Sequence, residues 1–367
     1  MSDLFPFQLP AATAWYAVLE VATLLLHVVF MTYVLAGTIM LGVAGGRGLL
    51  GREGGTSAWQ PVATLLKEWM PFALSAAITA GIGPLLFVQI LYQQEFYTAN
   101  LLSSHRWMAI LPVLIVAFYL LYVLKAHRLE GRRIAQGTVA FVIMTCMLFV
   151  AWSWVEDHLR SLDRAGWAEQ YASDDLVYTD RAIGPRLVFW IAAAFPTACA
   201  VIAWQLRHGA SGIARDVGER ALRPLAGLSL AMLVLAALDA WPALTGPAKE
   251  NALIATKANF TVASVLLALG SVLQALHWLP VWRGGRPTTA QRYGLAAGVV
   301  LFWLGALVAR EVARLSALAT PELFARHEKV ATTAGFGVFL VFAVITIGVV
   351  AWIVATVSRA TRGESGV

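Results

Sequence analysis

A carboxylate and an imidazole lie inside the first long apolar run of the sequence, from Ala14 to Val43. Glu20 and His27 are seven residues apart, which is two helical turns, so both side chains project from the same side of one helix. Ionisable residues in such a segment are costly and by default mark a functional site. The pair could handle protons, ligate a metal or haem through the imidazole, or form hydrogen bonds within the core.

A second ionisable group closes a later apolar run. Arg310 and Arg314 are one turn apart, and Glu311 and Arg314 are neighbours at i, i+3. These side chains could form a cluster of ion pairs that reaches the membrane surface. They could equally hold the propionates of a haem, since guanidinium groups pair bidentately with carboxylates, and Glu311 is available as an oxygen ligand to iron.

Membrane helices must position these residues. The 367 residues are 59% hydrophobic and 13% charged, with a mean hydropathy of +0.71, which indicates a polytopic membrane protein and not a soluble one. About nine spans approach the roughly 20 residues that a bilayer requires. They are 14–43, 70–92, 106–124, 134–155, 186–206, 222–245, 258–280, 291–313 and 331–357. We therefore expect an all-α integral membrane protein, with residues 1–367 forming a single transmembrane helical domain.

Basic residues predict the orientation. The net charge of +6 is assigned to connections between helices, so no nucleic-acid partner is expected. With the N-terminus outside, the inner side holds Arg47, Arg52, Lys67, Lys125, Arg128, Arg132, Arg133, Arg207, Arg215, Arg220, Arg223, Arg283, Arg286, Arg292, Arg359 and Arg362. This bias favours an N-terminus outside and a C-terminus inside, in a bacterial inner membrane that the chain crosses many times.

In this orientation, the polar residues gather at the outer pole. Glu20 and His27 lie in the outer half of span one, and Arg310, Glu311 and Arg314 close span eight. The other members are His105 before span three, His158 at the end of span four, Asp239 in span six and His327 before span nine. We interpret His105, His158 and His327 as solvated interface residues. The functional alternative is that His105 or His158 reaches a haem or its propionates.

With these motifs in order, the chain resembles subunit I of the cytochrome bd family of quinol oxidases. His27 matches the first-helix haem-ligand histidine, and Glu311-Val312-Ala313-Arg314 matches Glu-Val-Gly-Arg, whose glutamate is a haem ligand in the family. Val150–Trp154 is similar to Val-Ala-Asn-x-Trp, and Gly246-Pro247-Ala248-Lys249 is similar to Gln-Pro-x-Lys. The resemblance implies that His27 and Glu311 ligate one or two haems of b or d type.

The chain also departs from the family pattern. Three features of the family are missing: a histidine near 186–190 that would bind the low-spin haem, a methionine near 260–263, and a pair of glutamates expected within 108–125. The loop that binds quinol in the family is reduced here to residues 249–257. Such a subunit would depend on a c-type cytochrome or another redox subunit docking at the outer face, and on other membrane subunits, including one like bd subunit II. Reduction of oxygen at the remaining site, as in a terminal oxidase, stays open.

Two other function classes remain. The chain could be a haem-free scaffold within a larger respiratory complex, since several ligands of the family are missing. It could also be a transporter, because Ala80–Pro84 resembles the break of a discontinuous helix. The segment 92–97 is expected to form a polar outer loop that could dock a partner.

Overall fold

The computed structural model describes residues 9–50, 57–173, 178–208, 212–245, 251 and 253–333, with single positions between 337 and 352. Within these ranges the regular structure is helical and contains no strand, as expected for an all-α protein. The helices are α1 (Ala11–Gly46), α2 (Gln60–Leu91), α3 (Gln93–Ser103), α4 (His105–Lys125), η3 (His127–Leu129), α5 (Arg133–Leu162), η4 (Arg164–Gly166), α6 (Trp167–Ala172), α7 (Ile183–Arg207), α8 (Arg215–Thr245), α9 (Thr256–Trp282), α10 (Thr289–Leu318) and α11 (Pro321–Thr333).

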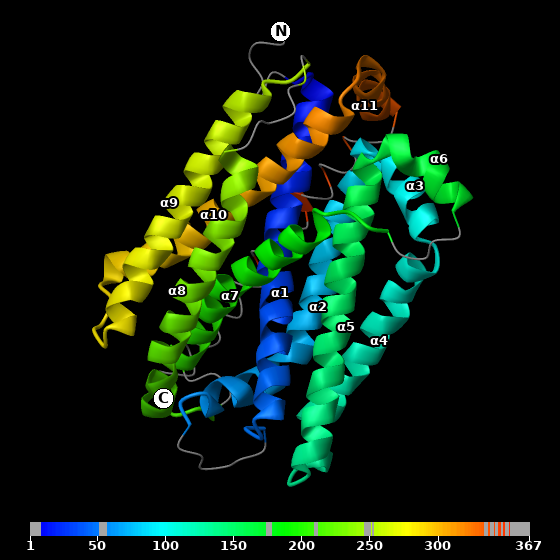
Figure 1. Ribbon diagram of the computed structural model, residues 1–367. Coiled ribbons are helices and arrows are strands. Elements are labelled where there is room, and N and C mark those ends of the chain that lie inside the picture. Colours follow the sequence, from blue (N-terminus) through cyan, green and yellow to red (C-terminus); the bar gives the residue numbers. More distant parts are fainter. Residues whose placement is uncertain are drawn as a thin grey trace.

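Eight of the described helices are long and apolar enough to cross a membrane, as in a multi-pass membrane protein: α1, α2, α4, α5, α7, α8, α9 and α10. Two thirds of the ninth expected span, 331–357, lie outside the described residues. Figure 1 shows the long helices running side by side, with the short helices α3, α6 and α11 together at one end. We call this end of the bundle the α11 end.

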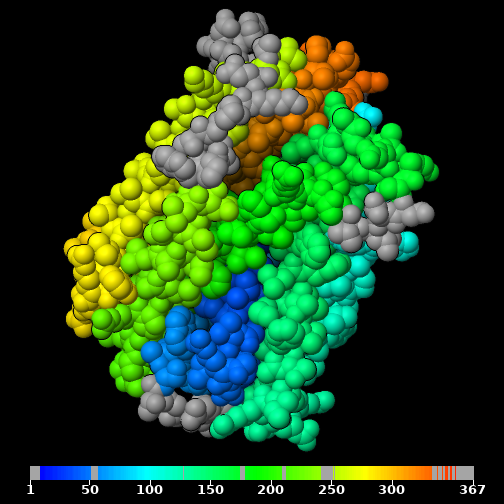
Figure 2. All heavy atoms as spheres, viewed as in Figure 1, coloured from blue at the N-terminus to red at the C-terminus, as the bar shows by residue number. Residues whose placement is uncertain are grey.

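Helix α1 is the centre of the bundle. It packs against α2, α5, α7 and α10, and in Figure 2 its surface is seen between α5 and α8. Glycine allows the closest of these approaches: a Cβ on Gly45 would lie 3.0 Å from Cα of Gly137 on α5. Small residues let membrane helices come together at such short distances. This packing fixes the orientation of α1 in the bundle, and therefore the direction in which the Glu20 side chain points.

Helices α9 and α10 form a second close pair. A Cβ on Gly270 would lie 2.7 Å from the carbonyl oxygen of Gly298, and closer still to the backbone nitrogen of Phe302. One on Gly305 would lie 2.6 Å from the carbonyl oxygen of Ala263. Because backbone touches backbone along this seam, α10 has a fixed position, and with it the charged residues near its C-terminal end.

Two helices extend beyond the apolar spans predicted from sequence. Helix α2 begins at Gln60, before the span 70–92, and it continues through Ala80–Pro84 without a break. The discontinuous helix that suggested a transporter is therefore not present. The first part of α2 contains the charged residues Lys67 and Glu68, so a search for apolar runs does not include it. Glu68 pairs with Lys125 Nζ at 3.4 Å. Helix α2 is therefore longer than the apolar run within it.

The connection between the predicted spans 134–155 and 186–206 is also partly helical. Helix α5 continues to Leu162 and carries Glu156, Asp157 and His158 in its last turns. Glu156 accepts hydrogen bonds from Arg106 on α4 and from Arg160, the latter at 3.1 Å. Partners on neighbouring elements thus permit a charged sequence to stay helical and buried.

A buried carboxylate joins the short elements at the α11 end. Glu95 of α3 is fully buried; it accepts a hydrogen bond from Arg164 of η4 and lies 3.7 Å from Nη2 of Arg326 on α11. The Glu95 carboxylate therefore connects three segments that are distant in sequence: α3, η4 and α11. Segment 92–97, expected as an outer loop, lies mostly in α3 and contributes this residue to the interior.

Replacing Arg164 is expected to weaken this joint. In Arg164→Ala the buried carboxylate of Glu95 keeps, among the described residues, the more distant Arg326 alone. We therefore expect a loss of about 1–3 kcal/mol in unfolding free energy, the cost of an unsatisfied buried polar group. The loss should appear as a lower midpoint of thermal unfolding in detergent. Arg326→Ala is the matched control, because it leaves the shorter contact intact. Equal midpoints for both variants and the parent would show that Glu95 does not hold these elements together.

Candidate functional site

Charged and polar side chains from three helices and one helix junction meet at the α11 end of the bundle. We call this group the Arg314 cluster; its members are Glu20 of α1, Tyr92 between α2 and α3, His158 of α5, and Arg310, Glu311 and Arg314 of α10. Glu20, Glu311 and Arg314 are only 2–4% exposed. Ionisable groups at this depth are costly unless paired, so their meeting marks this part of the bundle as a candidate site.

Ion pairs connect α1 with α10. Arg310 donates a hydrogen bond to Glu20 Oε1 at 3.3 Å, and Arg314 Nη1 lies 3.9 Å from the same oxygen. Arg314 Nη1 also lies 3.7 Å from Glu311 Oε2. The sequence predicted that Arg310, Glu311 and Arg314 are neighbours, and it gave no partner for Glu20. The fold brings Glu20 of α1 together with these three residues of α10.

Tyr92 completes one side of the cluster. Its hydroxyl donates a hydrogen bond to Glu311 Oε1, and the Arg314 guanidinium lies over its ring, 4.8 Å from the centroid. Burial raises the pKa of Tyr92 well above its ordinary value, so the phenol remains protonated and acts as the donor. The sequence indicated only a polar loop here, since nothing local connects residue 92 with residue 311.

His158 contacts Arg314 directly. Arg314 Nη2 lies 2.7 Å from His158 Nδ1, and the imidazole is 8% exposed. The expectation of a solvated His158 is thus wrong: its acidic neighbours suggested a water-exposed turn, whereas α5 carries it into the bundle. Four polar atoms of the cluster are buried and have no hydrogen-bond partner among the described residues. They are His158 Nε2, Glu311 Oε2, and Nε and Nη1 of Arg314.

His27 lies apart from the cluster. It is seven residues beyond Glu20, about 10.5 Å along the helix axis, and its ring packs against α2. The ring Nδ1 lies 2.9 Å from the carbonyl oxygen of Ala77, and a Cβ on Gly81 would lie 3.0 Å from the ring's Cε1. A carbonyl accepts only, so Nδ1 carries the proton and Nε2 is left with its lone pair.

The other predicted residues lie elsewhere. His105 is exposed and has Ser104 Oγ as its hydrogen-bond partner at 3.3 Å, which agrees with a solvated position. In the motif Val150–Trp154, Trp154 packs edge-on against Trp107 on α4. The motif Gly246–Lys249 lies outside the described residues.

His327 was also expected to be solvated, and it is instead 1% exposed. Its Nδ1 lies 2.9 Å from Thr13 Oγ1 of α1, and its Nε2 lies 2.7 Å from the carbonyl oxygen of Leu91 at the end of α2. Burial lowers the pKa of His327, so the neutral ring is favoured in the folded protein. His327 thus connects α11 to α1, which carries Glu20, and to the last residue of α2, which precedes Tyr92.

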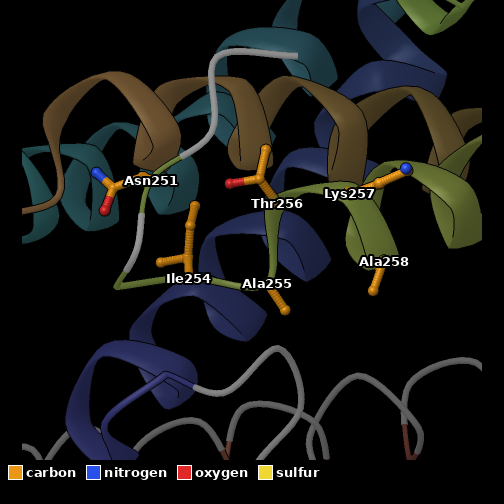
Figure 3. Close-up of a pocket in the computed structure, with 6 residues that line it drawn as sticks. All are labelled: Asn251, Ile254, Ala255, Thr256, Lys257 and Ala258. Carbon is orange, nitrogen blue, oxygen red and sulfur yellow. The ribbon is translucent and has the colours of Figure 1, made fainter. Parts of the chain in front are cut away.

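A cavity of about 150 Å³ lies beside the end of α10. Figure 3 shows its lining, which runs from Asn251 to the first turn of α9 at Thr256, Lys257 and Ala258. Asn251 Nδ2 donates to the carbonyl oxygens of Ser316 and Ala319, at 3.3 and 3.1 Å. The volume is below the roughly 300–1,000 Å³ of ordinary ligand sites. Its lining therefore serves to attach the α8–α9 connection to α10.

Over the described part of the chain, no three His, Cys, Asp or Glu side chains are grouped as a metal site would require. A haem needs fewer protein ligands, and three of the side chains described above have the donor chemistry that a haem uses. His27 Nε2 can donate its lone pair, Glu311 Oε2 is a carboxylate oxygen without a hydrogen bond among the described residues, and Arg314 has N–H groups in the same state. Neither a family model nor a curated protein matches the sequence.

Proposed function

We propose that this chain is a haem-binding subunit of a respiratory electron-transfer complex, similar to subunit I of the cytochrome bd family. In this proposal the α11 end faces the outside of a bacterial inner membrane, because 16 of the 27 Lys and Arg residues are assigned by sequence to the opposite side. The electron donor would be a c-type cytochrome or another redox subunit at that face, and other membrane subunits would surround the bundle.

The state of the His27 ring is the observation that supports this proposal most. Histidines that ligate a metal commonly donate their other ring N–H to a backbone carbonyl, which fixes the tautomer and the ring orientation. His27 has this arrangement with Ala77 as the acceptor at 2.9 Å, and Gly81 leaves room for the ring against α2. The Nε2 lone pair is thereby fixed in direction.

The Arg314 cluster would hold the second ligand. Tyr92 donates its hydroxyl proton to Glu311 Oε1, which leaves Oε2 as the oxygen able to ligate iron. Arg310 and Arg314 supply positive charge for carboxylate groups beside it. A bound haem would supply one-electron redox chemistry and could bind a small ligand such as oxygen.

Removing the imidazole tests the proposal. His27→Ala is expected to lose the haem held at this position, an effect larger than the about 10–100-fold loss of affinity typical when only the hydrogen-bond partner of a ligand is removed. Gly81→Leu, which displaces the ring without removing it, is expected to fall within that smaller range. The measurement is haem per protein by the pyridine haemochrome assay, with the Soret spectrum.

His208→Ala is the matched control, since this imidazole is exposed at the opposite end of the bundle. A haem-free scaffold is the competing proposal, and one observation favours it: the Arg310–Glu20 and Arg314–Glu311 pairs already balance their own charge. Parent protein with no haemochrome signal would exclude the haem subunit and favour the scaffold. Parent and His27→Ala proteins with equal haem content would exclude His27 as a ligand.

A further inference from the structure

We propose that His158 and Arg314 together form a buried carboxylate clamp, and that the group they bind is a propionate of the haem. This inference rests on the proposed function and adds a residue and a chemical partner to it. The clamp consists of unpaired N–H groups on the two side chains, which lie in direct contact between α5 and α10.

The contact with Arg314 determines where the His158 proton lies. A guanidinium has only N–H donors, so the 2.7 Å contact makes His158 Nδ1 the acceptor. The neutral ring must then carry its proton on Nε2. That N–H is completely buried and has no acceptor among the described residues. Buried donors are almost always paired, so an unpaired one indicates a missing acceptor.

Arg314 has the same surplus of donors. Its Nη2 is used by His158, while Nε and Nη1 have no hydrogen-bond acceptor within the described structure. The nearest carboxylate oxygens, of Glu20 and Glu311, lie 3.9 and 3.7 Å from Nη1, beyond hydrogen-bond distance. The two side chains thus present at least three N–H groups from one buried location.

The type of the unpaired groups favours an anion as the acceptor. Three guanidinium groups, of Arg314, Arg310 and Arg186, act electrostatically on His158. The carboxylates of Glu20 and Glu311 pair with Arg310 and Arg314 but leave Nε and Nη1 of Arg314 without a hydrogen bond among the described residues. His158 itself is 92% buried, since 8% of its surface is exposed, and Arg314 is 4% exposed. A carboxylate or a phosphate fits these donors, because charge-assisted N–H bonds to such oxygens are the strong ones. A haem carries carboxylates, and a lipid carries a phosphate, so the test must separate the two.

The test compares haem with its dimethyl ester, in which both carboxylates are blocked. Protein prepared without haem is titrated with each compound in detergent, and binding is followed by the Soret band. The parent is expected to bind free-acid haem about 10–100-fold more tightly than the ester, the range for a hydrogen bond to a charged group. His158→Phe, which keeps a ring but has no donor, is expected to lose most of this preference, and His158→Gln, which keeps an N–H, should retain part of it.

The outcomes separate the two proposals. If the parent binds neither compound, the proposed function fails and the clamp fails with it. If the parent binds both equally, or if His158→Phe keeps the full preference, haem binding stands and the clamp is wrong. Loss of co-purified phospholipid in His158→Phe, together with equal binding of the two compounds, would assign these donors to a lipid phosphate. His105→Ala, an exposed imidazole at the start of α4, is the control and should behave as the parent.

Discussion

Arg314→Leu is expected to destabilise the protein by about 3–5 kcal/mol, the cost of removing one partner from a buried ion pair. The substitution removes the ion-pair partner that Glu311 has among the described residues, and it removes one of the two guanidinium groups near Glu20. It also removes the cation over the Tyr92 ring and the donor to His158. The measurement is the midpoint of thermal unfolding in detergent, together with the fraction of monodisperse protein.

Two further variants separate charge from volume. Arg310→Leu is expected to cost less, because the Arg310 side chain is 22% exposed against 5% for Arg314. The double variant Glu311→Leu/Arg314→Leu is expected to recover part of the loss, since it removes both members of one pair and keeps the Arg310–Glu20 pair. An Arg314→Leu protein as stable as the parent would mean that the cluster adds nothing to folding.

Gly270→Leu is expected to prevent normal packing of α9 on α10. Even the first carbon of a side chain would lie 2.7 Å from the Gly298 carbonyl oxygen, and this oxygen belongs to a helix backbone that cannot rotate away. Overpacking typically costs about 1–3 kcal/mol where side chains can adjust, so backbone contact should place this variant at or above that range. Gly270→Ala is expected to show a smaller loss of the same kind.

Gly294→Leu is the control for this prediction. It introduces the same side chain on α10, but the nearest atom to a Cβ there is Leu273 Cδ2 at 4.0 Å. The two variants are compared by size-exclusion chromatography and by thermal midpoint, and Gly294→Leu should match the parent. If Gly270→Leu also elutes and unfolds as the parent does, the close seam between α9 and α10 is not a feature of the folded protein.

The spans could be predicted from sequence because bilayer thickness sets the length of an apolar run, and eight of the runs correspond to described helices. Hydropathy misses what lies beyond the apolar window, which is why the first turns of α2 and the last turns of α5 were assigned to loops. The last turns of α5 appear water-exposed in sequence because they contain Glu156, Asp157 and His158. These side chains are buried, and contacts with other parts of the fold offset the free-energy cost of their burial.

Part of the Arg314 cluster could also be predicted from the sequence. Arg310, Glu311 and Arg314 are close in sequence, so their mutual contact could be expected from helix geometry alone. Tyr92 is 219 residues from Glu311, and His158 is 156 residues from Arg314. Contacts at such separations depend on which helices pack together, and single-sequence periodicity does not contain that information.

The pairing of Glu20 with α10 has a consequence for biosynthesis. Arg310, its hydrogen-bond partner, follows it by 290 residues, so at about 5–20 residues per second it leaves the ribosome roughly 15–60 s later. During that interval α1 is already made, and a carboxylate that is 2% exposed in the finished protein has no cation to meet. Until α10 is made, the cost of a charged carboxylate in the bilayer favours a protonated Glu20 or a position of α1 that keeps Glu20 near the membrane surface.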